Sequence, residues 1–313
     1  MFRKAVGRYW VKAEDRTVVC SISNRLRKRL VYPTADPSSI RPHVVAVEEI
    51  RTVDPVAVGD EVEFRESGEG ASVITQVMPR RNKLNRRAAG RQPLEQVIAA
   101  NVDQMIAVVA AAQPRPKWRT LDRYLADAEH VGIPALVCLA KVDLVQGPDS
   151  PEGIDVYRGI GYQVVRTSAL TGEGLDEFRE VLRDRVSVFV GKSGVGKTTL
   201  LNALQPGLGL AVQEVSASTG KGRHTTSNLE MFELSFGGFV VDTPGMREFG
   251  LWKAESADTA ALFREMRPHL GRCRFGSSCT HSHEPGCAIK EAVDKGQIHP
   301  ARYESFLRMR GGR

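Results

Sequence analysis

The fold is decided by Val186-Ser-Val-Phe-Val-Gly-Lys-Ser-Gly-Val-Gly-Lys-Thr198, in which a short apolar strand leads into a glycine-rich loop. Residues 191–198 fit the pattern Gly-x-x-x-x-Gly-Lys-Thr, and residues 199–204 have the composition of a helix. Glycines allow backbone N–H groups to converge on phosphate oxygens, and the start of a helix adds a partial positive charge. The stretch therefore predicts a phosphate-binding loop between a buried strand and a helix.

The side chains of this loop suggest specific roles. We expect Lys197 to contact the β- and γ-phosphates of a nucleoside triphosphate and to stabilise the transferring phosphoryl group. Thr198 is expected to bind Mg²⁺. The predicted phosphate-binding set comprises Gly191, Lys192, Ser193, Gly194, Val195, Gly196, Lys197, Thr198 and Thr199.

A second motif that is expected to contact the phosphates is Asp242-Thr-Pro-Gly245, at the end of an apolar strand. We expect Asp242 to hold the Mg²⁺ and the Gly245 N–H to bond the γ-phosphate. The polar segment 219–227 lies between the two motifs. A threonine there would complete the metal shell only with the γ-phosphate bound, which would make the segment a switch. We assign this role to Thr226, although Thr225 fits the pattern equally well.

Apolar strands alternate with helices over the middle of the chain, which indicates a parallel sheet covered by helices on both faces. The predicted strands are Met105–Ala111, Ala135–Ala140, Tyr162–Arg166, Val186–Val190 and Phe239–Asp242, and the predicted helices include Leu121–His130 and Leu175–Leu182.

Two motifs that precede the phosphate loop are suited to recognising a base. Lys141-Val-Asp143 resembles the Asn-Lys-x-Asp element of GTPases, in which the carboxylate accepts two N–H donors of guanine and the lysine stem covers the base. Ser168 and Ala169 end the next strand and match the loop that contacts the guanine carbonyl oxygen. The carboxyl ends of parallel strands are where open α/β sheets bind ligands. Ordinary small GTPases have these motifs after the phosphate loop, so the sequence predicts a circularly permuted domain.

Charge is distributed unevenly along the chain. The total of +7 comprises +7 in residues 1–92, −5 in residues 93–263 and +5 in residues 264–313. Two basic ends around an acidic middle suggest a polyanion held by separate modules. The composition, with 42% hydrophobic and 26% charged residues, excludes a disordered, collagen-like or coiled-coil chain. Signal-peptide and membrane-spanning patterns are absent, so we expect a cytoplasmic protein with no membrane partner.

The first 80 residues contain short β-branched runs separated by turns, which predicts a small five-stranded barrel. An oligonucleotide-binding (OB) barrel suits the basic composition, but the pattern does not distinguish it from an SH3-like barrel. The next stretch, Pro79–Arg91, has six basic and no acidic residues. It is predicted to be a connector, either one that tracks phosphates or a plain solvated one.

Four side chains near the C-terminal end have the spacing of metal ligands. Cys273, Cys279, His281 and Cys287 offer three thiolates and an imidazole, a closed set for one tetrahedral structural Zn²⁺. His283 is a competing ligand two residues further on. Four protein ligands leave no open position, so a catalytic zinc is not expected.

Taken together, these motifs resemble the circularly permuted ribosome small-subunit-dependent GTPase A (RsgA) family over nearly the full length. The resemblance implies an N-terminal OB-fold barrel with a basic linker in residues 1–92, a central circularly permuted α/β P-loop GTPase domain in residues 93–250, and a mainly helical zinc-binding domain in residues 251–313. The sequence departs from the family at Ala140, where the family usually has Asn. We expect Asp143 to preserve guanine selectivity without that side chain.

The resemblance also implies an activity and a partner. GTP would be hydrolysed by in-line attack of water, with Mg²⁺ and one structural Zn²⁺ as cofactors. Met246 stands where many GTPases have the Gln that orients the water, so His224 is the expected substitute and forms the predicted catalytic set with Lys197. We expect a monomeric late maturation factor that binds the small ribosomal subunit and its rRNA and is released on hydrolysis.

Two other functions fit parts of the sequence. One is an ATP-dependent P-loop RNA-binding protein in which Lys141-Val-Asp143 is accidental. The other is an RNA-binding module with a vestigial nucleotide site, although the complete set of Lys197, Thr198 and Asp242 argues against it.

Overall fold

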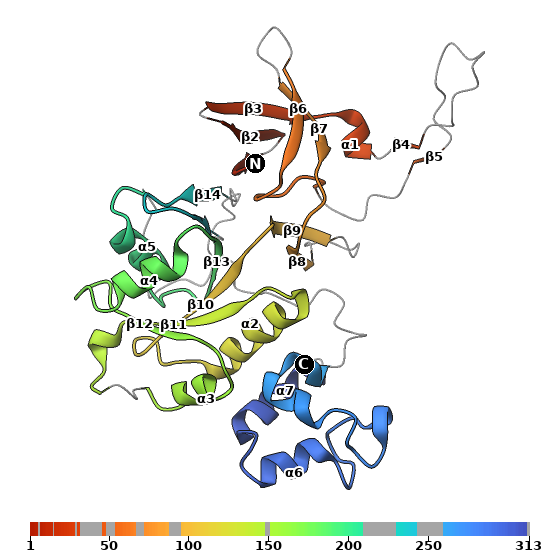
Figure 1. Ribbon diagram of the computed structural model, residues 1–313, viewed down its shortest axis with the longest axis vertical. Coiled ribbons are helices and arrows are strands. Elements are labelled where there is room, and N and C mark those ends of the chain that lie inside the picture. Colours follow the sequence, from red (N-terminus) through yellow and green to blue (C-terminus); the bar gives the residue numbers. More distant parts are fainter. Residues whose placement is uncertain are drawn as a thin grey trace, which may run out of the picture.

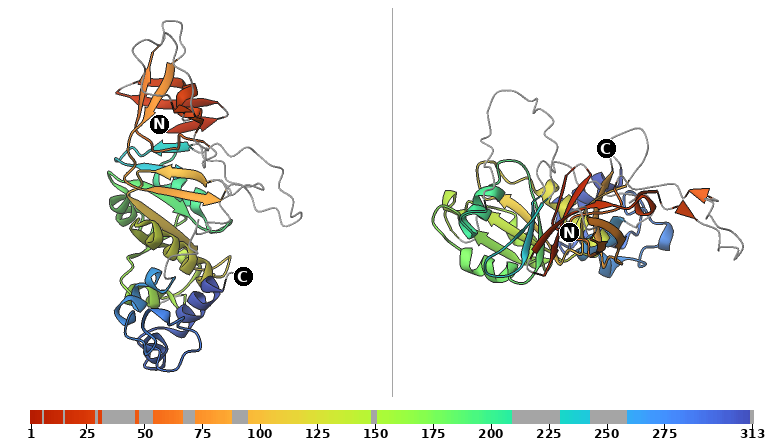
Figure 2. Two further views of the ribbon diagram at one scale, coloured as in Figure 1. Left: turned by 90° about the vertical axis from the view of Figure 1, so that its right-hand side faces the viewer. Right: turned by 90° about the horizontal axis from the view of Figure 1, so that it is seen from above.

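The computed structural model arranges the chain in three successive layers, seen as a column in the left-hand view of Figure 2. A β-barrel stands at one end, an α/β sheet lies in the middle, and a helical part that contains the C-terminus lies at the other end (Figure 1). The structure describes residues 1–5, 7–14, 16–28, 30–31, 46–47, 54–66, 72–87, 95–147, 151–208, 230–242 and 259–311. Among these residues, none of the helices combines the length and apolar character needed to cross a bilayer.

Five N-terminal strands form the barrel in the order β1-β2-β3-β7-β6. Strands β3 and β7 run parallel, and the other neighbours in this series are antiparallel. The start of the chain closes the barrel, because the Met1 ammonium donates to the Asp60 carbonyl (2.7 Å) and Gly59 N donates to the Met1 carbonyl (2.9 Å). This connectivity confirms the OB barrel over the SH3-like one. The bounds are β1 (Arg3–Ala5), β2 (Arg8–Ala13), β3 (Arg16–Ile22), β6 (Val62–Arg65) and β7 (Ser72–Val77), with α1 (Asn24–Lys28), β4 (Leu30–Val31) and β5 (Ala46–Val47) between β3 and β6.

The prediction of a connector over Pro79–Arg91 is wrong for part of that stretch. Residues Lys83–Arg87 form β8, which pairs antiparallel with β9 (Glu95–Ala100). Leu84 is 1% exposed and anchors β8 in the core. Two of the basic side chains are also paired within the protein, since Arg80 binds the buried Asp60 (Nε–Oδ1 2.7 Å) and Arg81 binds Asp103 (2.9 Å). The predicted domain boundary after residue 92 therefore falls between two strands that pair with each other.

The central sheet has the predicted parallel strands in the order β12-β11-β10-β13-β15. Strand β13 is fourth of the five along the chain but lies between the first and the fifth, as a circular permutation requires. Strand β14 extends the sheet antiparallel to β15 and pairs with β1 of the barrel, so one sheet of 11 strands runs through both parts. The bounds are β10 (Gln104–Ala110), β11 (Ala135–Ala140), β12 (Val164–Thr167), β13 (Val186–Val190), β14 (Glu230–Glu233) and β15 (Phe239–Asp242).

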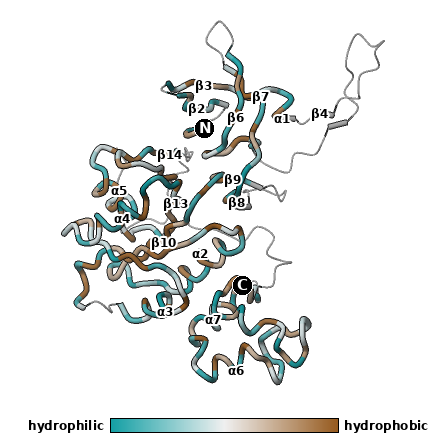
Figure 3. Tube along the Cα trace, viewed as in Figure 1, coloured by the Kyte–Doolittle hydropathy of each residue, from teal (hydrophilic) through white to brown (hydrophobic). Residues whose placement is uncertain are grey.

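Helices cover both faces of this sheet because the central strands are apolar on both sides. All seven residues of β10 are buried, and the trace in Figure 3 is strongly hydrophobic around β10 and β11. Met105 packs in the same cluster as residues of α2 and α3, whereas Ile106 packs with residues of α4 and α5. The helices are α2 (Trp118–Val131), α3 (Ile154–Gly159), α4 (Leu175–Leu182) and α5 (Lys197–Leu204), with a 3₁₀ turn η1 (Val142–Leu144) after β11.

The C-terminal part is helical and builds a small core of its own. Phe263, Met266, Ile289 and Phe306 are each at most 1% exposed, and Ala126 of α2 joins their cluster. The C-terminal part is thereby packed against the central sheet layer. Its elements are η3 (Thr259–Leu262), η4 (Arg264–His269), η5 (Gly276–Ser278), α6 (Ala288–Asp294) and α7 (Pro300–Arg310).

The contact between barrel and β9 yields a first prediction. Gly59 has a φ of +89°, and a Cβ atom added to it would lie 2.1 Å from the Ala100 carbonyl oxygen. Replacing Gly59 with Ala should destabilise the protein by at least about 2 kcal/mol, since a left-handed residue alone costs about 1–2 kcal/mol and the backbone must also move. Gly7→Ala is the matched control, because Gly7 (φ +71°) faces open space. Urea unfolding of both variants is the measurement, and equal losses would contradict the argument.

Candidate functional site

The phosphate loop joins β13 to α5 at the carboxyl edge of the parallel sheet. A side chain at Gly191 is excluded by close approach, since its Cβ would lie 2.6 Å from the Val108 carbonyl oxygen. Lys197 begins α5, and its Nζ donates to the carbonyls of Gly191 (2.6 Å) and Lys192 (3.2 Å). The ammonium group thus lies against the loop that precedes its own helix.

The lysine predicted to recognise the base, Lys141, contacts this loop directly. Lys141 has a left-handed backbone (φ 61°) at the end of β11, and its Nζ donates to the carbonyls of Gly194 (2.7 Å) and Gln113 (2.5 Å). Its stem runs past Gly196, where an added Cβ would lie 3.5 Å from Lys141 Cε. The ammonium therefore ties together the phosphate loop, the end of β11 and the connection between β10 and α2.

Two of the other predicted base-recognition residues, Asp143 and Ser168, contact each other. Ser168 is fully buried, and its Oγ donates to Asp143 Oδ1 (2.6 Å) while accepting from the amides of Leu170 (3.2 Å) and Thr171 (3.1 Å). Asp143 itself is exposed, and Ala169 is half-buried beside Ser168. The carboxylate is thus oriented by a rigid loop and remains accessible to a ligand.

Cations crowd the phosphate loop on the side of α2. Burial lowers the pKa of Lys192, and the neighbouring Lys117 and Arg123 lower it further. Lys117 directly precedes α2 and Arg123 lies in its second turn. An anion reduces the repulsion between positive charges that lie close together. The electrostatics at this edge therefore favour a phosphate-bearing ligand.

The remaining predicted residues are only partly described. Ala140 is 4% exposed at the end of β11, and Thr198 is half-buried in the first turn of α5. Asp242 is the last residue of β15, which lies next to β13, so its backbone has the expected place. The other predicted switch, nucleotide-binding and catalytic residues, His224, Thr225, Thr226 and Gly245, lie outside the described residues, as does Met246.

Two contributors to this site could not be found from the sequence. Gln113 acts through its backbone carbonyl, which every residue has, so no residue type marks it. Lys117 carries a charge but belongs to no motif. Both are brought to the phosphate loop by the pairing of β10 with β13.

Three cysteines and a histidine form a compact buried cluster in the C-terminal part. The ligand atoms of Cys273, Cys279, His281 and Cys287 all lie within 4.8 Å of one another. Cys273 Sγ is 3.9 Å from Cys287 Sγ and 3.4 Å from His281 Nδ1. Tetrahedral zinc, with bonds of about 2.3 Å to sulfur and about 2.0 Å to nitrogen, separates its ligand atoms by such distances. The residues present therefore fit a zinc ion, and His283 is exposed and outside the cluster.

Comparison with known proteins agrees with this geometry. The family model described as RsgA GTPase matches residues 77–252. The chain belongs to the RsgA GTPase family. It is 45% identical over 257 residues to the small ribosomal subunit biogenesis GTPase RsgA of Gemmatimonas aurantiaca, covering 82% of this chain and 83% of that protein. The protein of the same name from Pseudomonas aeruginosa is 44% identical over 255 residues, with coverages of 80% and 74%.

Two solved structures match this family member over nearly its whole length. YjeQ from Thermotoga maritima superposes with a TM-score of 0.70 at 30% identity, covering 98% of this chain and 95% of that one. YloQ, described as a circularly permuted GTPase, gives a TM-score of 0.66 at 27% identity, with coverages of 99% and 92%. The predicted family, permuted fold and GTPase activity are therefore confirmed.

The contact between Ser168 and Asp143 leads to a second prediction. Ser168→Ala removes a buried hydrogen bond to a charged group, so GTP should bind about tenfold more weakly while ATP binding is unchanged. Thr171→Ala is the matched control in the same loop, because Thr171 Oγ1 only accepts from the Glu173 amide (3.4 Å) at an exposed position. Titration with a fluorescent GTP analogue, with ATP as competitor, measures the affinities of both variants. Undiminished affinity in Ser168→Ala would remove this residue from the site.

The cysteine and histidine cluster gives a third prediction. His281→Ala should reduce bound zinc from about one ion per chain to near zero and unfold the C-terminal part, because a closed four-ligand site holds the ion and the fold together. His283→Ala should keep its zinc, since His283 is exposed and bonds Ser282 Oγ (3.0 Å). Metal analysis after dialysis and circular dichroism test this pair. Zinc loss in both variants would contradict the assignment of ligands.

Proposed function

We propose that this GTPase is a late maturation factor of the small ribosomal subunit, which binds rRNA in its GTP form and leaves after hydrolysis. The observation that carries the nucleotide part is the Lys141 ammonium, which bonds the phosphate loop while Asp143, two residues on, is oriented by Ser168. Base and phosphate recognition thus converge on one sheet edge. This arrangement supports GTP over ATP, because a carboxylate at the base site matches the two N–H donors of guanine.

In the proposed reaction, water attacks the γ-phosphate in line with the leaving oxygen. Lys197 and the backbone N–H groups of residues 191–196 would stabilise the transferring phosphoryl group. His224 would orient the attacking water, since Met246 at the usual Gln position has no hydrogen-bonding group suited to it. The catalytic set is therefore Lys197 and His224.

The residues at the phosphate loop also fit a magnesium ion. Thr198 offers a hydroxyl in the first turn of α5, and Asp242 ends the strand adjacent to β13. Oxygen ligands of this kind are the ones that Mg²⁺ prefers. Thr226 would join them when the γ-phosphate is present. Bound Mg²⁺ supplies neutralisation of charge on the β- and γ-phosphates.

The partner follows from the names of the relatives and from the charge. Relatives at 40–45% identity are named for small ribosomal subunit biogenesis. The net charges of +7 in residues 1–92 and +5 in residues 264–313 would suit contacts with rRNA phosphates from the barrel and from the zinc-bearing part. We further propose that the protein works as a monomer in the cytoplasm. We propose three functional parts near the predicted divisions 1–92, 93–250 and 251–313, with the paired strands β8 and β9 joining the first two parts across the boundary at residue 92.

The fourth prediction concerns turnover. Small ribosomal subunits should raise the GTP turnover of this chain by at least about tenfold, because the partner completes a site that lacks the usual Gln. The stimulation should weaken steadily as salt is raised from 50 to 200 mM, since phosphate contacts release counterions. Phosphate release with and without subunits, over that salt series, is the measurement.

Controls separate the parts of this proposal. Large ribosomal subunits should not stimulate, and His224→Ala should bind GTP normally while losing most of the stimulated rate. The absence of stimulation at every salt concentration would defeat the ribosomal part. Stimulated turnover that persists in His224→Ala would exclude that residue from the mechanism.

A further inference from the structure

Helix α2 is shared by the central sheet and the C-terminal part. Leu121 and Leu125 pack in the cluster that contains the strands of the sheet. Ala126, on another side of the same helix, packs with Phe263 and Phe306. A displacement of the C-terminal part would therefore move α2. Through α2 it would also act on the connection that joins β10 to this helix.

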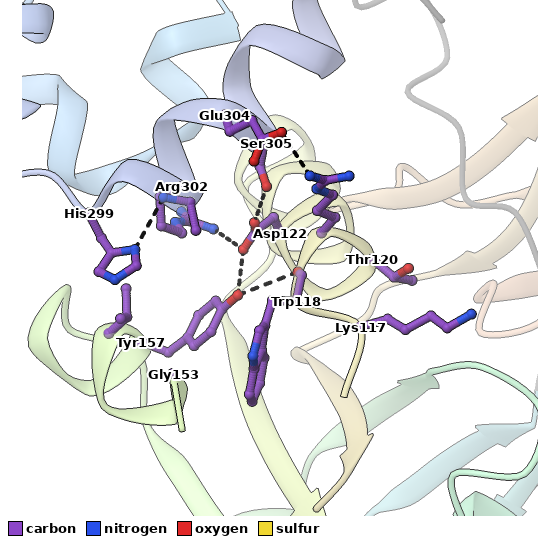
Figure 4. Close-up of a pocket in the computed structure, with 13 residues that line it drawn as sticks. Lys117, Trp118, Thr120, Asp122, Gly153, Tyr157, His299, Arg302, Glu304 and Ser305 are labelled. Carbon is purple, nitrogen blue, oxygen red and sulfur yellow. Dashed lines mark hydrogen bonds and ion pairs between the residues drawn. The ribbon is translucent and has the colours of Figure 1, made fainter. Parts of the chain in front are cut away.

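Asp122 of α2 is the polar centre of this contact, and Figure 4 shows the donors converging on it. Its side chain is 2% exposed. Its Oδ1 accepts from Tyr157 Oη of α3 (2.6 Å) and from Arg302 Nη1 of α7 (2.6 Å), and its Oδ2 accepts from Ser305 Oγ. A buried carboxylate with three donors from two other helices holds those helices in one arrangement.

Arg302 connects the same carboxylate to a second acid. Its Nε donates to Glu265 Oε1 (2.7 Å), and the guanidinium lies over the Phe263 ring at 4.6 Å. Burial alone would lower the pKa of Arg302, but hydrogen bonds and charges of Glu265 and Asp122 raise it instead. The guanidinium therefore stays charged and serves both acids, so losing Asp122 would leave a buried charge less well compensated.

A cavity of about 500 Å³ opens beside this cluster. The first turns of α2 and α7 line it, with Trp118, Tyr157 and His299 among the residues that face it. Since side chains do not fill this space, packing contributes little there. The hydrogen bonds of Asp122 are the buried polar link between the starts of these helices, and the ion pair of Arg119 with Glu304 is an exposed one.

The start of α2 leads directly to the nucleotide site. Residues 111–117 connect β10 to α2, and the Gln113 carbonyl within them accepts from Lys141 Nζ. The same Nζ donates to Gly194 of the phosphate loop, and Lys117 lies close enough to Lys192 to lower its pKa. The connection between β10 and α2 thus supports both the base-recognition lysine and the phosphate loop.

We infer that Asp122 is a positioning residue for GTP, which fixes the start of α2 against α7 so that Gln113 holds Lys141 over the phosphate loop. This inference rests on the proposed nucleotide site. It makes the contact with the zinc-bearing part a requirement for tight nucleotide binding, although no residue of that part lies at the phosphate loop among the described residues.

The test is Asp122→Asn in the full-length chain. The amide keeps the size of the side chain and one acceptor, but it loses the charge that faces Arg302. The affinity for a fluorescent GTP analogue should fall about tenfold, within the range of measured couplings between sites. Zinc content should stay at one ion per chain. A merely structural Asp122 would lower the unfolding temperature and leave the affinity of the folded protein unchanged.

Matched controls make each outcome decisive. Glu304→Gln removes the exposed ion pair with Arg119 (2.8 Å) between the same two helices and should change GTP affinity less than twofold. If Asp122→Asn does not fold, Ser305→Ala removes one bond to Asp122 and should weaken GTP binding about threefold. Folded Asp122→Asn or Ser305→Ala with wild-type affinity would overturn the inference. Failure of the wild-type chain to bind GTP would instead overturn the proposed nucleotide site, and this inference with it.

Discussion

The pairing of β10 with β13 is the interaction on which the rest of the structure depends. Its register is set by polar groups at the amino ends of the strands, where Gln104 Nε2 donates to Ser187 Oγ (3.0 Å) and Asp103 Oδ2 accepts from the Val186 amide (2.8 Å). Both Gln104 and Ser187 are buried, so a slip by one residue would break the hydrogen bond between them inside the core. At the opposite ends of the strands, this fixed register places the phosphate loop beside the connection to α2.

This pairing also explains how a permuted order of motifs yields one site. In the chain, Lys141 and Asp143, the residues predicted to recognise the base, come about 50 residues before the phosphate loop. In space, the two are joined by one ammonium group because parallel strands present all their carboxyl ends at a single edge. Chain order therefore matters less to the chemistry than strand order in the sheet does.

The sequence was sufficient for the elements whose side chains follow a strong period or motif. The apolar runs at β10, β11 and β13 are stable only when buried, so they predict core strands. The glycine-rich loop after β13 has a pattern that is typical of phosphate binding. The compact cluster of three cysteines and a histidine, which fits a zinc ion, was also identifiable, since crowded thiols are costly to bury without a role. His283 could be separated from His281 only by its exposure, which spacing does not encode.

Prediction failed where tertiary contacts override composition. Lys83–Arg87 is as basic as a solvated connector, yet it forms a strand because Leu84 is buried and β9 supplies hydrogen bonds. Arg80 lies in the stretch predicted to contact phosphates or solvent, but it binds Asp60, 20 residues earlier. The hydrogen bonds around Asp122 could not be predicted for the same reason, since the residues that make them are separated by up to 183 positions in the chain.

The pairing of β14 with β1 has a consequence for the integrity of the molecule. The Met231 amide donates to the Phe2 carbonyl (2.7 Å), so the barrel occupies hydrogen-bonding groups that β14 would otherwise present to solvent. Unpaired strand edges are templates for association with other chains. The barrel therefore covers a strand edge that could otherwise pair with another chain. A shortened chain that began after the barrel would expose this edge of β14, next to the strand that ends at Asp242.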